Sequence, residues 1–178
     1  DYSNNKGKSF YSKEHSELIT LYDNNMVTGL AGTGTTMYMT VASKYGAGDE
    51  VWMVLKSTDS GQTWSKATID NFVLATGKEN MVNDIRVEND TVYTIGTSKD
   101  IGDINHWIVR KSVDAGTTWA TVHNYQYVAG NTARAVDLAI SEDTIFVIGK
   151  ANDGSAVTHC VVNKSIDGGT TWTTVDDF

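Results

Sequence analysis

The chain has 178 residues, 40% of them hydrophobic, which is the length of one ordinary domain with a sizeable core. Its 22 acidic residues against 14 Lys and Arg give a formal net charge of −8, which argues against nucleic acid or an anionic membrane as the main partner. No run of about 18 apolar residues occurs, so we expect no membrane insertion. The single cysteine excludes an internal disulfide.

Residues 1–25 differ in pattern from the rest of the chain. They are polar as far as Glu17; Leu18–Tyr22 then predicts a strand and Asp23–Asn25 a turn. We interpret this piece as a partial repeat unit or a linker. Because the chain begins at Asp1 without Met or an apolar signal region, we expect a processed or excised product.

The pattern Ser-x-Asp-x-Gly-x-Thr-Trp occurs three times in residues 26–178, and its aspartates lie 55 and then 53 positions apart. In such a turn the Asp accepts hydrogen bonds from backbone N–H groups, the Gly supplies a positive φ, and Thr-Trp resumes a strand. We therefore predict a structural hairpin staple in preference to a carboxylate triplet for catalysis or metal binding. Its residues are Ser57, Asp59, Gly61, Trp64, Ser112, Asp114, Gly116, Trp119, Ser165, Asp167, Gly169 and Trp172.

Four strand signals align column by column in three repeats, which we place at about 26–74, 80–123 and 133–178. The predicted first strands are 27–31, 82–86 and 135–139, the second 36–40, 91–95 and 144–148, the third 52–56, 107–111 and 160–164, and the outer 64–69, 119–123 and 172–175. Cys160 aligns with Trp52 and Trp107, so we expect it to be a small buried hydrophobe. Since no segment has a sustained 3.6-residue period, the chain is predicted to be all-β, with four-stranded antiparallel units.

The repeated pattern resembles the Asp-box, or BNR repeat, of sialidases, of some other glycoside hydrolases and of sorting-receptor ectodomains. This resemblance implies a β-propeller in which each box lies on the hairpin between the third and fourth strands of a blade, facing away from the active site. It covers the chain from about Asn25 to the end. Because enzymes, lectins and receptors share the box, it implies architecture and leaves function open.

Three repeats and a fragment are fewer than the 4 to 8 blades of usual propellers. The open blade faces must be covered, so we predict an incomplete propeller that is completed by other subunits or by further chain. The alternatives are a homodimer of half-propellers, a part of a longer protein, and a trimeric fibre head. We favour self-association.

Ligand candidates come from the loops opposite the predicted hairpins, since loops on a rigid scaffold usually carry binding. Aromatic, acidic and amide side chains there suit a sugar, although a solvated rim is the preferred interpretation for any one of them. A calcium site at Asp100, Asp103 and Asn105 lacks a full ligand set, so no metal and no cofactor are predicted. The candidate ligand-binding residues are Tyr45, Asp49, Asp103, Asn105, His106, Tyr125, Tyr127 and Arg134.

A sialidase-like site would need three arginines around the substrate carboxylate, a Tyr–Glu nucleophile pair and an acid/base Asp. The chain has three arginines, of which Arg110 lies on the wrong side, Arg86 ends an innermost strand, and Arg134 alone is placed to face a pocket. Asp84 and Asp137 occupy matching innermost positions where the first repeat has Gly29. With Arg134 they are weak catalytic candidates; we prefer a role in binding backbone or water.

The sequence therefore predicts a secreted or cell-surface module for glycan recognition or adhesion, with a glycan or cell-surface ligand and without catalysis. One alternative is a segment of a sialidase-like glycoside hydrolase. The other is a protein-interaction or assembly module.

Overall fold

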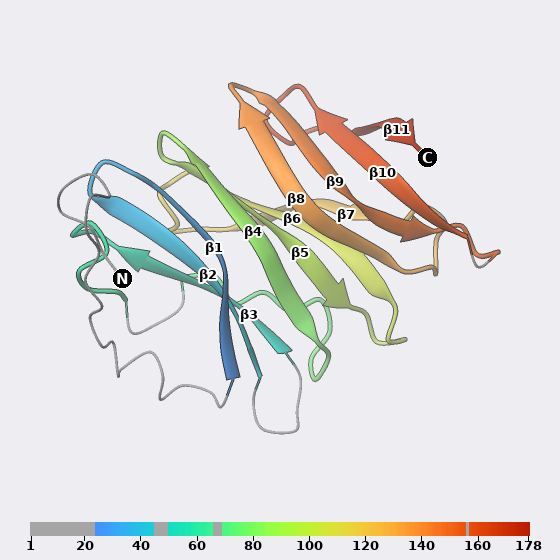
Figure 1. Cartoon of the computed structure of the whole chain (residues 1–178), viewed down its shortest axis with the longest axis horizontal. Coiled ribbons are helices and arrows are strands. Elements are labelled where there is room, and N and C mark those ends of the chain that lie inside the picture. Colours follow the sequence, from blue (N-terminus) through green and yellow to red (C-terminus); the bar gives the residue numbers. More distant parts are fainter. Residues whose placement is uncertain (1–23, 45–49, 66–68, 156) are drawn as a thin grey trace.

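The computed structural model describes residues 24–44, 50–65, 69–155 and 157–178. Eleven strands form three antiparallel sheets, which Figure 1 shows side by side in chain order. The predicted all-β class is confirmed. The described part of the chain contains no helix, and therefore none long and apolar enough to cross a membrane.

Within each sheet the strands follow one another in chain order. The first sheet contains β1 (Asn24–Thr33), β2 (Thr36–Lys44) and β3 (Glu50–Ser57). The second contains β4 (Asn80–Glu88), β5 (Thr91–Lys99), β6 (Asn105–Ser112) and β7 (Ala120–Tyr125). The third contains β8 (Ala133–Ser141), β9 (Thr144–Asn152), β10 (Thr158–Ser165) and β11 (Thr173–Asp177).

The start of the chain departs from the predicted pattern in one detail. Asn24 and Asn25, predicted as part of a turn, belong to β1, because they pair with the end of β2 at Lys44 and Ser43. The predicted strand at 18–22 lies outside the described residues. The outer strand predicted at 64–69 lies partly outside them, and a bridge between Val54 and Asp70 marks that edge of the first sheet.

Each innermost strand contains a β-bulge at the same repeat position. The register shifts fall at Val27/Gly29 in β1, Val82/Asp84 in β4 and Ala135/Asp137 in β8. A bulge adds one unpaired residue and re-aims the side chains beside it. Gly29, Asp84 and Asp137 therefore follow equivalent bends in three neighbouring strands.

The three Ser-x-Asp-x-Gly-x-Thr-Trp segments, which we call the repeat turns, have the same hydrogen bonds. In each, the Ser Oγ donates to the Asp Oδ1 (2.7, 2.8 and 2.8 Å in chain order) and accepts from the Gly N–H (2.9, 2.8 and 2.8 Å). The Thr before the Trp donates its N–H to Asp Oδ1 (2.8 Å in all three) and its hydroxyl to Asp Oδ2 (2.5, 2.7 and 2.6 Å). The Gly has a φ of 81°, 86° or 94°, a conformation that disfavours any side chain.

These bonds favour the ionised carboxylate. Hydrogen bonds from Thr63, Thr118 and Thr171 lower the pKa of Asp59, Asp114 and Asp167 to about 2. The three carboxylates are therefore ionised at ordinary pH and committed to their own hairpins, as the staple interpretation expects.

At the first seam, where the first and second sheets pack together, the indole of Trp52 packs against Gly96. A Cβ built on Gly96 would lie 2.6 Å from Cζ3 of the fully buried Trp52, so no larger residue fits there. At the other end of the sheets, the Tyr38 hydroxyl and the Lys56 ammonium both donate to the carbonyl of Ala115 in the second repeat turn, at 3.0 and 2.7 Å.

The second seam, between the second and third sheets, repeats this arrangement. Trp107 is fully buried, and a Cβ built on Gly149 would lie 2.8 Å from its Cζ3. The Tyr93 hydroxyl and the Lys111 ammonium donate to the carbonyl of Gly168 in the third repeat turn, at 3.2 and 2.7 Å. The second and third repeat turns thus each cap the sheet that precedes them.

The expectation that Cys160 is buried is wrong, because its side chain is exposed. Cys160 does occupy the column of Trp52 and Trp107, at the start of β10. Those indoles are buried by the sheet that follows each of them. No described sheet follows the third one, so the same column lies open there.

We predict that Ser112→Ala lowers the free energy of unfolding by about 1–3 kcal/mol, because the buried N–H of Gly116 and the Asp114 carboxylate both lose a partner. Urea unfolding measured by tryptophan fluorescence checks this. Ser141→Ala, at an exposed position at the end of β8, is the control and should change stability little. Equal stabilities of the two variants would contradict the role given to the repeat turn.

Candidate functional site

One end of the sheets carries a pocket shared by all three of them. Antiparallel pairing brings the starts of the first and third strands of each sheet to the end opposite the repeat turns. There a pocket of about 540 Å³ opens between β1, β4 and β8. Its lining includes Met26, Thr28, Met81, Asn83, Arg134 and Lys150.

The pocket combines an apolar surface with a cationic side. Arg134 and Lys150 are register partners on β8 and β9, and both are exposed. The Asn83 amide donates to the carbonyl of Ala135 at 2.6 Å and so ties β4 to β8 beside the pocket. Two neighbouring cations beside apolar side chains suit a ligand that has both an acidic group and an apolar face.

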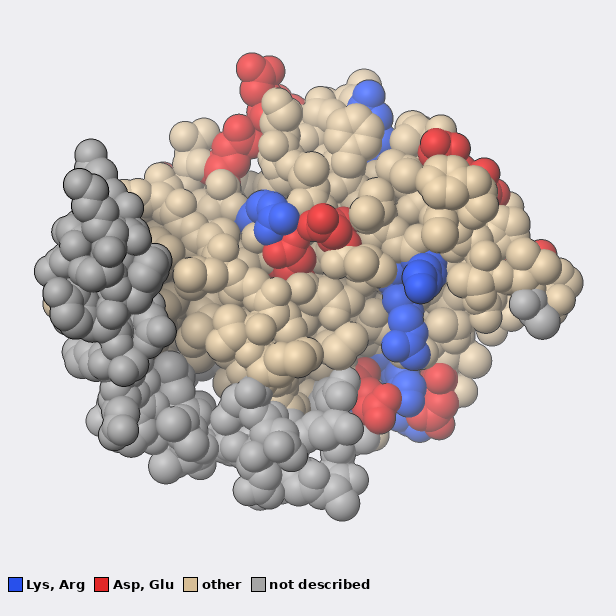
Figure 2. Space-filling model, in the orientation of Figure 1, with Lys and Arg blue, Asp and Glu red and all other residues tan. Residues whose placement is uncertain are grey.

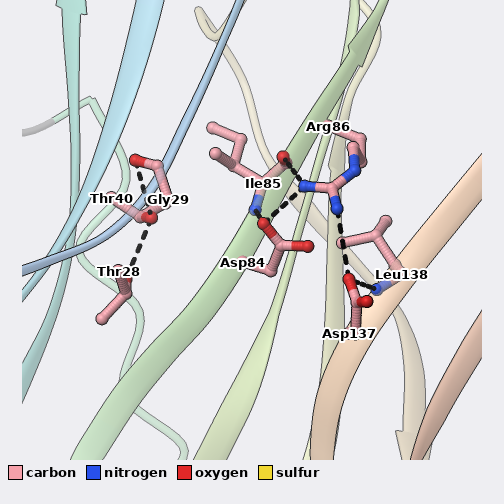
Figure 3. A network of polar contacts seen from close by, with 8 residues as sticks. All are labelled: Thr28, Gly29, Thr40, Asp84, Ile85, Arg86, Asp137 and Leu138. Carbon is pink, nitrogen blue, oxygen red and sulfur yellow. Dashed lines mark hydrogen bonds and ion pairs between the residues drawn. The ribbon is translucent and has the colours of Figure 1, made fainter.

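Next to the pocket, Asp84 and Asp137 are joined by one arginine (Figure 3). The Arg86 guanidinium donates from Nη1 to Asp84 Oδ1 at 2.6 Å and from Nη2 to Asp137 Oδ1 at 3.2 Å. Each carboxylate also accepts the N–H of the next residue, Ile85 or Leu138, at 2.8 Å. Figure 2 shows acidic and basic side chains together on this face of the molecule, among uncharged ones.

The two carboxyl groups lie in different environments. The Asp84 side chain is 13% exposed and that of Asp137 is 57% exposed. Burial, and next the neighbouring carboxyl of Asp137, raise the pKa of Asp84 above its ordinary value. The Oδ2 atom of Asp84 is buried and has no hydrogen-bond partner among the described residues, which makes the ionised form costly.

The first sheet leaves space for this pair. A Cβ built on Gly29 would lie 3.2 Å from Asp84 Oδ1 and 2.9 Å from the hydroxyl of Thr40. The Thr28 hydroxyl donates to that of Thr40 at 3.0 Å, beside Gly29 (Figure 3). An acidic side chain at position 29 would collide with its neighbours. Of the three equivalent positions, only 84 and 137 therefore carry a carboxyl group.

The candidate residues from the β5–β6 connection are occupied with local contacts. Asp103 pairs with Lys78 at 2.8 Å, and Asn105 is buried. His106 lies 2.7 Å from the amide oxygen of Asn124 and 3.2 Å from Asp100. The Asp100 carboxylate also accepts two backbone N–H groups. The described residues include no group of three or more His, Cys, Asp or Glu side chains placed to hold a metal ion.

The two candidate tyrosines belong to separate contacts. Tyr125 packs edge-on against Trp107, with ring centroids 5.3 Å apart. Tyr127 stacks on His159 at 4.6 Å and donates its hydroxyl to Asp177 at 2.7 Å. The Asp177 carboxylate also bonds His159 at 2.6 Å and raises the pKa of that imidazole. Tyr45 and Asp49 lie outside the described residues.

Of the described ligand candidates, Arg134 lines the pocket, and Asp103, Asn105, His106, Tyr125 and Tyr127 are not among its lining residues. The structure adds Arg86, Lys150 and Asn83 to the site. The sequence signal for Arg86 is its place two residues after Asp84 in an innermost strand. Arg110, as its position predicted, lies elsewhere: it pairs with Asp70 at 2.7 Å.

We predict that the pKa of Asp84 lies above the ordinary value for Asp, and that Asp137 and Arg86 shift this pKa in opposite directions. Asp137→Asn removes the neighbouring carboxyl that raises the pKa of Asp84 and so lowers that pKa, whereas Arg86→Gln removes a cation and raises it. Carbon-detected NMR titration of the Asp side chains measures both shifts. An unshifted Asp84 in the wild-type chain would contradict this environment.

Comparison with known proteins supports the fold. No model of a protein family matches the chain, and no curated protein matches it. Among solved structures, it is similar to an α-L-arabinofuranosidase of Fusarium graminearum (18% identity, TM-score 0.56, covering 84% of this chain and 48% of that one). It is also similar to a protein of unknown function from Dyadobacter fermentans (15% identity, TM-score 0.61, covering 86% of this chain and 50% of that one). A GH32 β-fructofuranosidase of Bombyx mori is a third similar structure (11% identity, TM-score 0.53, covering 84% of this chain and 35% of that one).

At these identities the likeness shows the fold alone. The three sheets match the blades of β-propellers, so the predicted incomplete propeller is confirmed. The chain spans half or less of the length of these structures.

Proposed function

We propose that this chain is a glycan-recognition module built on part of a β-propeller. The observation that carries the proposal is the pocket between the innermost strands, bordered by Arg134 and Lys150 and adjoining the Asp84–Arg86–Asp137 group. Guanidinium and ammonium groups bind carboxylates, and the apolar lining fits the nonpolar face of a sugar ring. An acidic glycan is the ligand that best matches this surface.

Two further findings support the proposal. Two of the structural neighbours named above are glycosidases by name, an arabinofuranosidase and a fructofuranosidase, although the low identities carry only the fold. The repeat turns are held by internal hydrogen bonds, and their sequence pattern resembles the Asp-box, a motif of propellers that include sialidases. An adhesion role at a cell surface or in secretion belongs to the same proposal.

Binding to a glycan array tests the proposal directly. We expect acidic glycans to be retained, and Arg134→Gln to weaken their binding by about tenfold or more because a charged hydrogen bond is lost. Lys78→Gln is the matched control, since it removes one positive charge outside the pocket lining and should leave binding unchanged. No binding to any glycan, or equal losses in both variants, would reject the proposed pocket.

A second candidate is part of a glycoside hydrolase, and the unequal carboxyl pair favours it. Hydrolysis of glycosides uses one carboxyl that stays protonated and one that stays ionised. The Asp84 side chain is 13% exposed and its pKa is raised by burial, whereas the Asp137 side chain is 57% exposed, so the two carboxyl groups differ in environment. Arg86 holds them on neighbouring strands at the edge of the pocket.

The hydrolase candidate predicts turnover of chromogenic glycosides that either Asp84→Asn or Asp137→Asn reduces by at least about a hundredfold. Release of the chromophore, followed against pH, is the measurement. Turnover that survives both substitutions would come from a contaminant, and glycan binding without turnover would leave recognition as the function.

A further inference from the structure

The third sheet retains the aromatic ring and the lysine with which the other two sheets receive a repeat turn, but Phe146 lacks the hydroxyl that Tyr38 and Tyr93 donate. In β2 and β5 the receiving aromatic ring is Tyr38 or Tyr93, which are 1% and 4% exposed. The equivalent residue of β9, Phe146, is 38% exposed. Ile148 of β9 is 44% exposed, whereas its equivalent Ile95 is fully buried.

The lysine of the receiving site is also present. The Lys56 and Lys111 ammonium groups lie 5.6 and 5.3 Å from the centres of their tyrosine rings while they bond the next repeat turn. Lys164 lies 5.1 Å from the centre of the Phe146 ring, in the same arrangement. No described carbonyl of a following turn is available to it. The third sheet thus presents the ring and the ammonium group of a receiving site, and no repeat turn of the described residues lies on them.

The first repeat turn, at the other end of the row of sheets, is the counterpart of this receiving site. A Cβ built on Gly116 would lie 2.6 Å from Ile69 of the preceding sheet, and one on Gly169 3.3 Å from Val122. For Gly61 of the first repeat turn, the contact within 4 Å among the described residues is Trp64 of its own hairpin. Its neighbour Ser60, which carries the carbonyl equivalent to those of Ala115 and Gly168, is exposed.

We propose that the first repeat turn of a second copy of this chain docks on the open face of the third sheet, at Phe146, Ile148 and Lys164. A chain with a receiving site at one end, and at the other a turn that no other described sheet covers, can join head to tail. Two copies of three sheets, related by a two-fold axis, then close a ring of six blades, within the usual range.

Side-chain sizes at the new seam favour the first sheet of a second copy as the occupant. Within the chain, a Trp of the third strand meets a Gly of the next sheet. At the proposed seam the pair would be Cys160 and Val41, a small residue facing a larger one. Val41, Met53 and Leu55 are 6%, 5% and 1% exposed in the single chain, so this face of the first sheet is already covered and docking requires its present cover to be displaced.

Light scattering coupled to size exclusion, over a range of concentrations, tests the proposal on the full 178-residue chain. We expect a mass roughly twice 19.4 kDa. Phe146→Glu and Lys164→Met should each raise the dimer dissociation constant by at least about tenfold, because one places an unpaired charge in the seam and the other removes its donor. Ile101→Glu, at an exposed site on the β5–β6 connection, is the control and should leave the dimer intact.

Each outcome decides the matter. A wild-type monomer at all concentrations, or a trimer, overturns the two-fold ring, and a dimer that both variants leave unchanged overturns the assigned face. Far-UV circular dichroism and melting curves establish that the variants are folded, which the exposure of Phe146 in the single chain leads us to expect. The glycan proposal is tested separately through Arg134, so either can fail without the other.

Discussion

Two backbone carbonyls, those of Ala115 and Gly168, each accept a hydroxyl and an ammonium hydrogen bond from the preceding sheet, and the packing of the three sheets depends on them. They can accept these bonds because the repeat turns hold them in place through internal hydrogen bonds. The positive φ values of Ala115 and Gly168 belong to the same turn geometry. Local chemistry in eight residues therefore fixes how whole sheets meet.

The sequence predicted the strands well because alternating β-branched and aromatic residues recur at a fixed period. Prediction failed where neighbours outside the repeat decide the outcome. Cys160 shares its column with two buried tryptophans, yet its burial depends on a following sheet. Asn24 and Asn25 have turn-forming side chains, but pairing with β2 holds them in a strand.

The candidate site was only partly predictable for a related reason. Asp84 and Asp137 were found from their matching positions, but the bridge between them depends on the direction of the Arg86 side chain, which no spacing reveals. Tyr125, Tyr127 and His106 have chemistry suited to a ligand, and the structure shows them engaged with Trp107, Asp177 and Asn124. Residue type alone does not distinguish a binding group from one that fastens a loop.

The pocket draws its walls from all three sheets of a single chain, so it does not straddle the proposed contact between copies. A two-fold axis along the centre of the ring would place two such pockets on one face, pointing in the same direction. Such an assembly is bivalent. A glycan polymer or a densely glycosylated surface that reaches both pockets would be held with an avidity well above the affinity of either, without any additional contact.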